Sequence, residues 1–214
     1  MIELSKILKL YKRGTDTFTA LENINLKIEK GDFCSVIGPS GAGKSTLLYI
    51  IGGLIRPNSG KVLYKGNDLY RQSNKEINLF RKKQLGFMFQ QFHLMPYLTV
   101  TENIRLACND KRQTEDINYY LEKCSLTGMK NKYPSELSVG EKQRTAFIRA
   151  IISKPEILLA DEPTGNLDAV NSEILMSLVE DYHKNEGTVV MVSHNPDIGK
   201  YANRIVSLNK GQMQ

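Results

Sequence analysis

Several residues in this 214-residue chain have the types and the spacing that phosphate chemistry requires. Residues 38–46 read GPSGAGKST and fit the pattern G-x-x-x-x-G-K-[ST]. In such a loop, backbone N–H groups surround phosphate oxygens, a lysine neutralises their charge, and a hydroxyl holds Mg²⁺. The pattern predicts a phosphate-binding loop formed by Gly38, Pro39, Ser40, Gly41, Ala42, Gly43, Lys44, Ser45 and Thr46.

The segments that flank this loop must position it, and both have a suitable composition. Residues 33–37, FCSVI, form a short and largely apolar run that is typical of a buried parallel strand. Residues 46–51, TLLYII, predict a buried helix whose N-terminal N–H groups and dipole face the bound anion. A glycine turn that only joins two core elements is the alternative, and the motif in this context disfavours it.

Two adjacent acids, Asp161 and Glu162, follow a second apolar run at residues 157–160. This run has no polar alternation and predicts a buried strand, and doubly wound sheets bind ligands at the carboxyl ends of their strands. A buried pair of acids is costly unless a metal ion or a reacting water uses it. We therefore expect Asp161 to bind Mg²⁺ and Glu162 to activate the attacking water. A solvated helix-capping pair before Pro163 is the alternative.

Three further segments add to the motifs that could handle phosphate. LSVGEKQR spans residues 137–144, ADEPTGNLD spans residues 160–168, and His194 follows the apolar run at residues 189–193. Together with the loop, these segments resemble the nucleotide-binding subunit of an ATP-binding-cassette (ABC) transporter, and the resemblance covers essentially the whole chain. It implies an α/β fold, with a P-loop NTPase core, an antiparallel β subdomain and an inserted helical subdomain. It also implies that ATP and Mg²⁺ bind.

The resemblance assigns roles around the phosphates. Residues 44–46 correspond to ligands of the phosphates and of Mg²⁺, and Gln90 corresponds to the glutamine that links metal and water. His194 resembles the family's switch histidine on the γ-phosphate; a capped core histidine is the alternative, which its place after a buried strand disfavours. His93 and His183 lack such support, and we expect them to be solvated. The implied catalytic residues are Glu162, His194 and Gln90, and the implied metal ligands are Ser45, Gln90 and Asp161.

Other implied residues contact the base or close the site. Tyr11 corresponds to the aromatic residue that stacks on adenine, while half-buried packing at the end of an alternating strand is its alternative. Asp168 corresponds to the acid of the loop that communicates between two subunits. Ser138 and Gly140 correspond to signature residues that close over ATP held by a second copy of the chain.

The signature departs from the common family form at Val139 and Glu141, where the family has glycine and glutamine. Ser138 and Glu141 also fit a capping box before a helix predicted over residues 142–153. A capped helix N-terminus is itself an anion site, so one element can serve both roles. Because Glu141 adds negative charge and Val139 lacks the backbone freedom of glycine, we expect a weaker ATP sandwich and a mostly monomeric isolated subunit.

The composition fits a self-folding ATPase that has no membrane span. Hydrophobic residues make up 41% of the chain, enough for one α/β domain with a substantial core. No apolar run approaches eighteen residues, and residues 1–6 do not resemble a signal peptide, so we expect a cytoplasmic protein. The cysteines are too widely spaced to predict a disulfide framework or a zinc site; they are Cys34, Cys108 and Cys124.

The chain has a formal net charge of +6, but its basic residues are scattered apart from one cluster at residues 81–83, RKK. This cluster closes a predicted amphipathic helix and has no interleaved aromatic residues, so we expect no nucleic-acid partner. We interpret the positive excess as a solvated surface beside an anionic inner leaflet. The expected location is therefore peripheral, on the inner face of the cell membrane.

The order of the predicted elements indicates how the chain is organised. Residues 1–28 and 61–64 predict antiparallel strands, and the middle of the chain predicts helices, including one over residues 117–124. Strands return at Ile157, Thr188 and Arg204, with a helix over residues 171–185 between the first two. We predict a single ABC ATPase domain over residues 1–214, with residues 1–89 and 154–214 as catalytic core plus antiparallel β subdomain and residues 90–153 as helical subdomain.

An ATPase without a membrane span must drive something else, and the resemblance implies a separate integral-membrane permease. Residues 92–98, FHLMPYL, are apolar where a loop is normally polar, which favours a partner site over ordinary packing. The sequence around residues 96–99 and the TGNLD segment resemble those of the subgroup that serves lipoprotein release, macrolide or antimicrobial-peptide export, and cell-division signalling. The first alternative is coupling to a permease-like partner for cell-division or stress signalling without transport. A non-transport ABC ATPase acting on DNA or ribosomes and a P-loop kinase explain fewer of the motifs.

Overall fold

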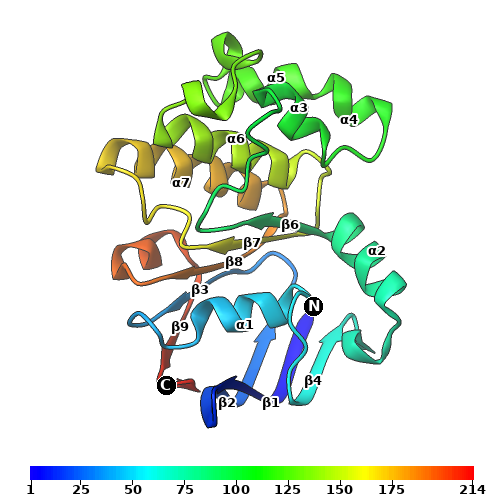
Figure 1. Ribbon diagram of the computed structural model, residues 1–214, viewed down its shortest axis with the longest axis vertical. Helices are drawn as coiled ribbons and strands as arrows, with labels where there is room; N and C mark the ends of the chain where they lie inside the picture. Colours follow the sequence, from blue (N-terminus) through cyan, green and yellow to red (C-terminus); the bar gives the residue numbers. More distant parts are fainter.

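The computed structural model describes residues 1–214, with the exception of the side chains of Arg13 and Lys111. A six-stranded sheet crosses the middle of the molecule with strand order β10-β9-β3-β8-β7-β6 (Figure 1). The strands from β9 to β6 run parallel, and β10 is antiparallel to β9. These strands are β3 (Phe33–Ile37), β6 (Leu85–Met88), β7 (Ile157–Asp161), β8 (Thr188–Ser193), β9 (Arg204–Asn209) and β10 (Gln212–Met213).

Unbroken apolar runs form the central strands because both faces of this sheet are covered. Every residue of β7 and β8 is buried. Asp161 at the end of β7 pairs with Val192, and Ile37 at the end of β3 pairs with Ser193. Three neighbouring strands therefore end at the same edge of the sheet, and the segments that follow them lie close together.

A smaller antiparallel sheet has the strand order β2-β1-β4-β5 and lies on the far side of α1 from the larger sheet (Figure 1). Its strands β1 and β2 form a long hairpin in which Tyr11 pairs with Phe18. The strands are β1 (Ile2–Arg13), β2 (Asp16–Ile28), β4 (Ser59–Tyr64) and β5 (Asn67–Asp68).

Helix α1 (Lys44–Ile51) lies between the two sheets (Figure 1). Its residues Leu47 and Ile50 are fully buried in one hydrophobic cluster with Ile7 of β1 and Val190 of β8. The helix is therefore held from both sides by apolar side chains. This packing determines the position of the phosphate loop, which leads directly into the helix.

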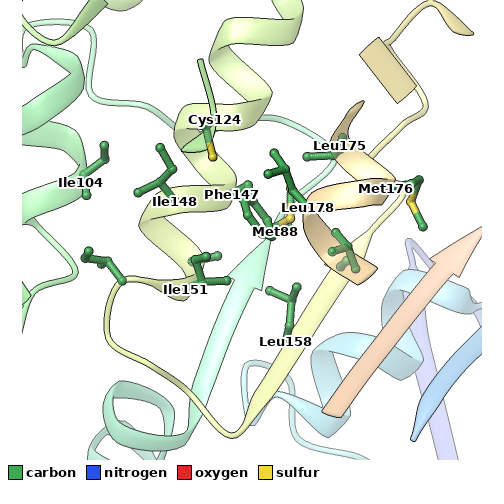
Figure 2. Close-up of a cluster of buried hydrophobic side chains, with 14 of the residues drawn as sticks. Met88, Ile104, Cys124, Phe147, Ile148, Ile151, Leu158, Leu175, Met176 and Leu178 are labelled. Carbon is green, nitrogen blue, oxygen red and sulfur yellow. The ribbon is translucent and has the colours of Figure 1, made fainter. Parts of the chain in front are cut away.

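The opposite face of the large sheet is covered by α6 (Val139–Ile151) and α7 (Ala169–Lys184) (Figure 1). Phe147 of α6, Leu178 of α7 and Leu158 of β7 meet in a second buried cluster (Figure 2). Further α-helices are α2 (Asn74–Gln84), α3 (Val100–Arg105), α4 (Lys111–Glu115) and α5 (Ile117–Lys123).

The α/β architecture with a separate antiparallel sheet agrees with the predicted fold class. The helix predicted over residues 142–153 begins earlier, at Val139, and ends at Ile151, because Ser138 and not a later residue is its N-cap. The division at residues 90 and 153 stays a prediction. In the described part of the chain, no helix combines the length and the apolar character that crossing a membrane requires.

The expectation that His183 is solvated is wrong. Its Nε2 lies 2.8 Å from the carbonyl oxygen of Gly31, and its ring meets the ring of Phe33 edge-on at a centroid distance of 5.5 Å. The side chain therefore closes the end of α7 against the sheet. His93 is exposed, as expected.

Candidate active site

The phosphate-binding loop joins β3 to α1, and its backbone path requires glycine at Gly43. This residue has a φ of +102°, and a Cβ atom there would lie 2.4 Å from the backbone oxygen of Ala20. A side chain would therefore strain the backbone and collide with β2. Glycine at this position lets α1 begin at the next residue, Lys44, while the loop stays in contact with the smaller sheet.

The side chain of Lys44 turns back over the loop and is 4% exposed. Its Nζ donates hydrogen bonds to the carbonyl oxygens of Gly38 and Pro39, each at 2.9 Å. Nζ also lies 3.6 Å from Oε1 of Glu162. A buried ammonium group is tolerated only with such partners, so these contacts hold a positive charge inside the loop.

The carboxylate of Asp161 is almost completely buried at the end of β7. It accepts hydrogen bonds from Ser45 Oγ and from the Tyr49 hydroxyl, each at 2.8 Å. Burial raises the pKa of Asp161 above its ordinary value, while the two hydrogen bonds act in the opposite direction. Tyr49 was not predicted, although its spacing of four residues from Ser45 places both on one face of α1. Carboxylate and hydroxyl oxygens are hard ligands, so this arrangement fits Mg²⁺.

The carboxylate of Glu162 lies between a lysine and a histidine. Its Oε2 is 2.8 Å from Nδ1 of His194, on the side opposite to the contact of Oε1 with Lys44. The Glu162 backbone has a φ of +43° and donates its N–H to the carbonyl of Val192 at 2.9 Å. Such a conformation is strained in a residue other than glycine and is found at functional sites. The neighbouring strands β7 and β8 therefore deliver an acid and a histidine to one place.

A cavity of about 390 Å³ opens beside these groups. The aromatic rings of Tyr11 and Phe18 line it, and Lys9 Nζ lies 5.0 Å from the centroid of the Tyr11 ring. Phe18 was not predicted, because its place opposite Tyr11 depends on the register of the β1–β2 hairpin. The complete lining is Tyr11, Phe18, Ala20, Ser40, Gly41, Gly43, Lys44, Ser45, Thr46, Gln90 and Glu162.

The predicted signature residues do not line this cavity in the described chain; they begin α6 instead. Ser138 Oγ accepts the backbone N–H of Glu141 at 3.3 Å, and Glu141 Oε2 accepts the backbone N–H of Ser138 at 2.7 Å. The predicted capping box is therefore confirmed. The hydrogen bond from the Ser138 N–H also lowers the pKa of Glu141. The carboxylate is therefore bonded to the N-terminus of its own helix.

Gly140 is linked to Asp168 through Asn171. A Cβ atom at Gly140 would lie 2.3 Å from Oδ1 of Asn171, and the same oxygen accepts a hydrogen bond from Arg144 at 2.9 Å. Asn171 in turn donates its side-chain amide and its backbone N–H to the carboxylate of Asp168. The backbone N–H holds the pKa of Asp168 below its usual range. The signature helix and the loop after Glu162 are therefore joined within one chain.

Comparison with known proteins agrees with this geometry. Residues 21–165, more than half of the chain, match the family described as "ABC transporter". The chain belongs to the ABC transporter family. Among its relatives, the uncharacterized ABC transporter ATP-binding protein MJ1508 of Methanocaldococcus jannaschii is 42% identical over 218 residues, which cover all of this chain and 97% of the relative. The lipoprotein-releasing system ATP-binding protein LolD of Shewanella oneidensis is 38% identical over 220 residues, covering all of this chain and 96% of LolD.

A solved structure of the same family has a closely similar fold. It is the dimeric, post-hydrolysis state of the ATP-binding cassette MJ0796 of Methanocaldococcus jannaschii, bound to ADP and Pi. The TM-score is 0.94 at 35% identity, and the match covers all of this chain and 97% of the other. The predicted family, its subgroup and the fold class are confirmed, and the chain is an ABC transporter ATP-binding subunit. The roles of single residues stay predictions.

Replacement of Lys44 tests the loop as a phosphate site. Lys44→Ala removes a charged donor, and we expect ATP binding to weaken by about 1.5–3 kcal/mol, or roughly 10- to 150-fold in Kd. Isothermal titration calorimetry measures this directly. Lys12→Ala, which removes an exposed lysine from the β1–β2 hairpin, is the control and should bind normally. Unchanged ATP affinity in Lys44→Ala would contradict the assignment of the loop.

The raised pKa of Asp161 makes a prediction about stability. The unfolded chain loses this proton at lower pH than the folded chain does, so ionisation penalises the folded state above the folded pKa. The penalty is absent below roughly pH 4, where both states are protonated. Ligand-free Asp161→Asn should therefore melt above the wild type at neutral pH, with a difference that shrinks toward pH 4.

The same variant should lose the stabilisation that we expect Mg²⁺ and ATP to give the wild type, because Asp161 is a predicted metal ligand. Differential scanning fluorimetry measures both effects in one series. Asp197→Asn, at an exposed acid, is the control. A lower melting temperature of Asp161→Asn at neutral pH would show that the two hydrogen bonds to the carboxylate outweigh its burial.

Proposed function

We propose that this chain hydrolyses ATP to ADP and phosphate, as a dimer, and thereby drives a separate integral-membrane permease. The observation that carries this proposal is the position of Glu162, with its carboxylate 2.8 Å from His194 and 3.6 Å from Lys44 beside the cavity. A base, a histidine and a phosphate-neutralising lysine are the groups that hydrolysis of a phosphoanhydride needs. The solved relative that is described as bound to ADP and Pi supports the reaction.

The geometry supports a step for each group in this proposal. The loop and Lys44 bind the phosphates, and the rings of Tyr11 and Phe18 offer faces on which adenine can stack. Glu162 accepts a proton from a water that attacks the γ-phosphorus, while the bond from that phosphorus to the oxygen of ADP breaks. His194 would orient Glu162 through their 2.8 Å contact and, as the family resemblance implies, would contact the γ-phosphate. Ser45, Gln90 and Asp161 would hold Mg²⁺, which when bound neutralises phosphate charge.

A second copy of the chain completes the site in this proposal. Ser138 and Gly140 lie outside the cavity of their own chain, so they are available to close over ATP in the partner copy. The dimeric state named for the MJ0796 structure supports this arrangement. Asp168 would couple the sites of the two copies, since Asn171 links it by hydrogen bonds to the signature helix α6. The expected weakening of the closed dimer by Val139 and Glu141 stays a prediction.

The permease docks, we propose, on the surface formed by residues 92–98 and the hollow beside it. Tyr97 is 72% exposed, which is unusual for a large aromatic residue. A cavity of about 460 Å³ lies next to this segment, lined by aromatic residues that include Phe87 and Phe89. Arg149 fixes the segment by donating to the carbonyls of Phe92 and His93, each at 2.6 Å. A preformed apolar hollow of this size suits an amphipathic helix.

The partner would place the chain in the cytoplasm, on the inner face of the cell membrane. The similarity to LolD supports an exporter or a lipoprotein- or peptide-type system. Coupling to a permease-like partner for signalling uses the same surfaces, so it is a variant of this proposal and not a different mechanism.

Glu162→Gln tests the proposed reaction. The amide keeps the shape of the carboxylate but cannot accept the proton, so steady-state hydrolysis should fall by at least ~10²-fold while ATP still binds. A phosphate-release assay and calorimetry separate the two. Glu115→Gln, at an exposed glutamate on α4, should retain full activity. Near-wild-type turnover by clean Glu162→Gln protein would remove Glu162 from this role.

Tyr97→Asp tests the docking surface. A charge in the centre of an apolar contact should cost about 2 kcal/mol or more, roughly 30-fold in affinity, and Met95→Asp should act similarly. Basal ATPase activity should stay nearly intact, because neither residue lines the nucleotide cavity. Co-purification with the permease partner is the measurement. Tyr119→Asp, at an exposed tyrosine on α5, is the control; full recovery of both docking variants would place the contact elsewhere.

A further inference from the structure

A second pocket, distinct from the nucleotide cavity, lies between the segment after α1 and helix α2. Its volume is about 320 Å³. Two guanidinium groups and two side-chain amides supply its polar lining, and none of the lining side chains in the described chain is a carboxylate. The lining is Gly53, Leu54, Arg56, Tyr70, Asn74, Ile77, Asn78 and Arg81.

Both arginines are held in place before any ligand arrives. Arg56 donates to the carbonyl of Tyr70 at 2.7 Å, and its guanidinium carbon lies 5.3 Å from the centroid of the Tyr70 ring. Arg81 donates to the carbonyl of Gly53 at 3.3 Å and to Asn78 Oδ1 at 2.7 Å. A guanidinium has five N–H donors, more than these bonds use. Preorganised guanidinium forks of this kind bind phosphate groups.

The charge around the pocket is also positive. Lys75, Lys82 and Lys83 are exposed on α2. The nearby acids are used elsewhere: Asp68 accepts the backbone N–H of Tyr70, and Glu76 completes the capping box at the start of α2. The basic cluster at the end of α2 thus contributes to a field that favours an anion at this surface.

Exposed leucines accompany these charges. Leu54, in the pocket wall, is 40% exposed. Leu79 is also exposed on α2, at 50%, but it lies on the solvent side of the helix and does not line the pocket. A free phosphate ion gains nothing from apolar side chains at the rim of its site. Binding to a membrane surface is favoured by both the apolar and the basic side chains, because an exposed leucine enters the interface while basic residues contact anionic headgroups.

We propose that this pocket binds the phosphate group of an anionic phospholipid headgroup, with Arg56 and Arg81 as its ligands. The proposal rests on the proposed placement of the chain at the inner face of a membrane, and it adds a contact with lipid that is independent of the permease. Leu54, in the pocket wall, then lies at the membrane surface.

Vesicle flotation with the full chain tests this proposal. Wild-type protein should float with vesicles of phosphatidylglycerol and phosphatidylcholine, and should stay unbound with phosphatidylcholine alone. Arg56→Gln should bind the anionic vesicles about fivefold more weakly, the effect of one basic residue near an anionic surface. Arg112→Gln, at an exposed arginine on α4, should bind like the wild type. Arg56→Lys should restore only part of the loss, because lysine keeps the charge but not the fork.

Equal binding of Arg56→Gln and Arg112→Gln to the anionic vesicles would overturn the proposal. Stabilisation of the wild type by inorganic phosphate alone, lost in Arg56→Gln, together with no vesicle binding would assign the pocket to a free anion and also overturn it. Loss of permease co-purification in Arg56→Gln with unchanged flotation would assign it to an acidic protein segment instead. ATP hydrolysis is measured for every variant: intact hydrolysis with failed flotation rejects the lipid site alone, whereas an inactive wild type rejects the proposed function.

Discussion

Lys44 carries its positive charge into a nearly closed loop, and much of the molecule is arranged around that charge. A buried ammonium is stable only when oxygen atoms surround it. The carbonyls of Gly38 and Pro39 and the carboxylate of Glu162 supply those oxygens. The loop can fold back in this way because Gly43 has a backbone conformation and a close approach to β2 that other residues cannot adopt. A phosphate bound in the proposed site would therefore meet a lysine that is already in place.

The parallel sheet explains why the other side chains of the proposed site gather at the same point. β3, β7 and β8 are neighbours that end in register, so the phosphate loop, the acid pair and His194 all leave from one edge. The apolar clusters on the two faces of the sheet keep this edge rigid, with α1 on one side and α6 and α7 on the other. The site thus depends on residues far from it in the sequence.

Local signals were sufficient for much of the fold and of the candidate site. The unbroken apolar runs predicted β3, β7 and β8, and the serine and glutamate of the signature predicted the capping box at the start of α6. These features depend on residues that are close in sequence, where spacing carries the information. α6 starts at Val139 and not at the predicted Lys142, because its N-cap, Ser138, marks the boundary.

Contacts between distant segments were harder to predict. The place of Phe18 beside Tyr11 depends on the register of the β1–β2 hairpin. Irregularities in β1 shift this register. The bond of Tyr49 to Asp161 and the contact of His183 with Gly31 depend on how helices pack on the sheet. The chain from Gly140 through Asn171 to Asp168 joins two helices whose relative position no local pattern encodes.

The most direct test of the central claim is an experimental structure of the chain with Mg²⁺ and a non-hydrolysable ATP analogue. We predict that Lys44 Nζ exchanges the carboxylate of Glu162 for phosphate oxygens, that one cation lies between Ser45 and Asp161, and that the base lies against Tyr11 and Phe18. A nucleotide bound outside this cavity, or one bound within it while Lys44 remains paired with Glu162, would contradict the account.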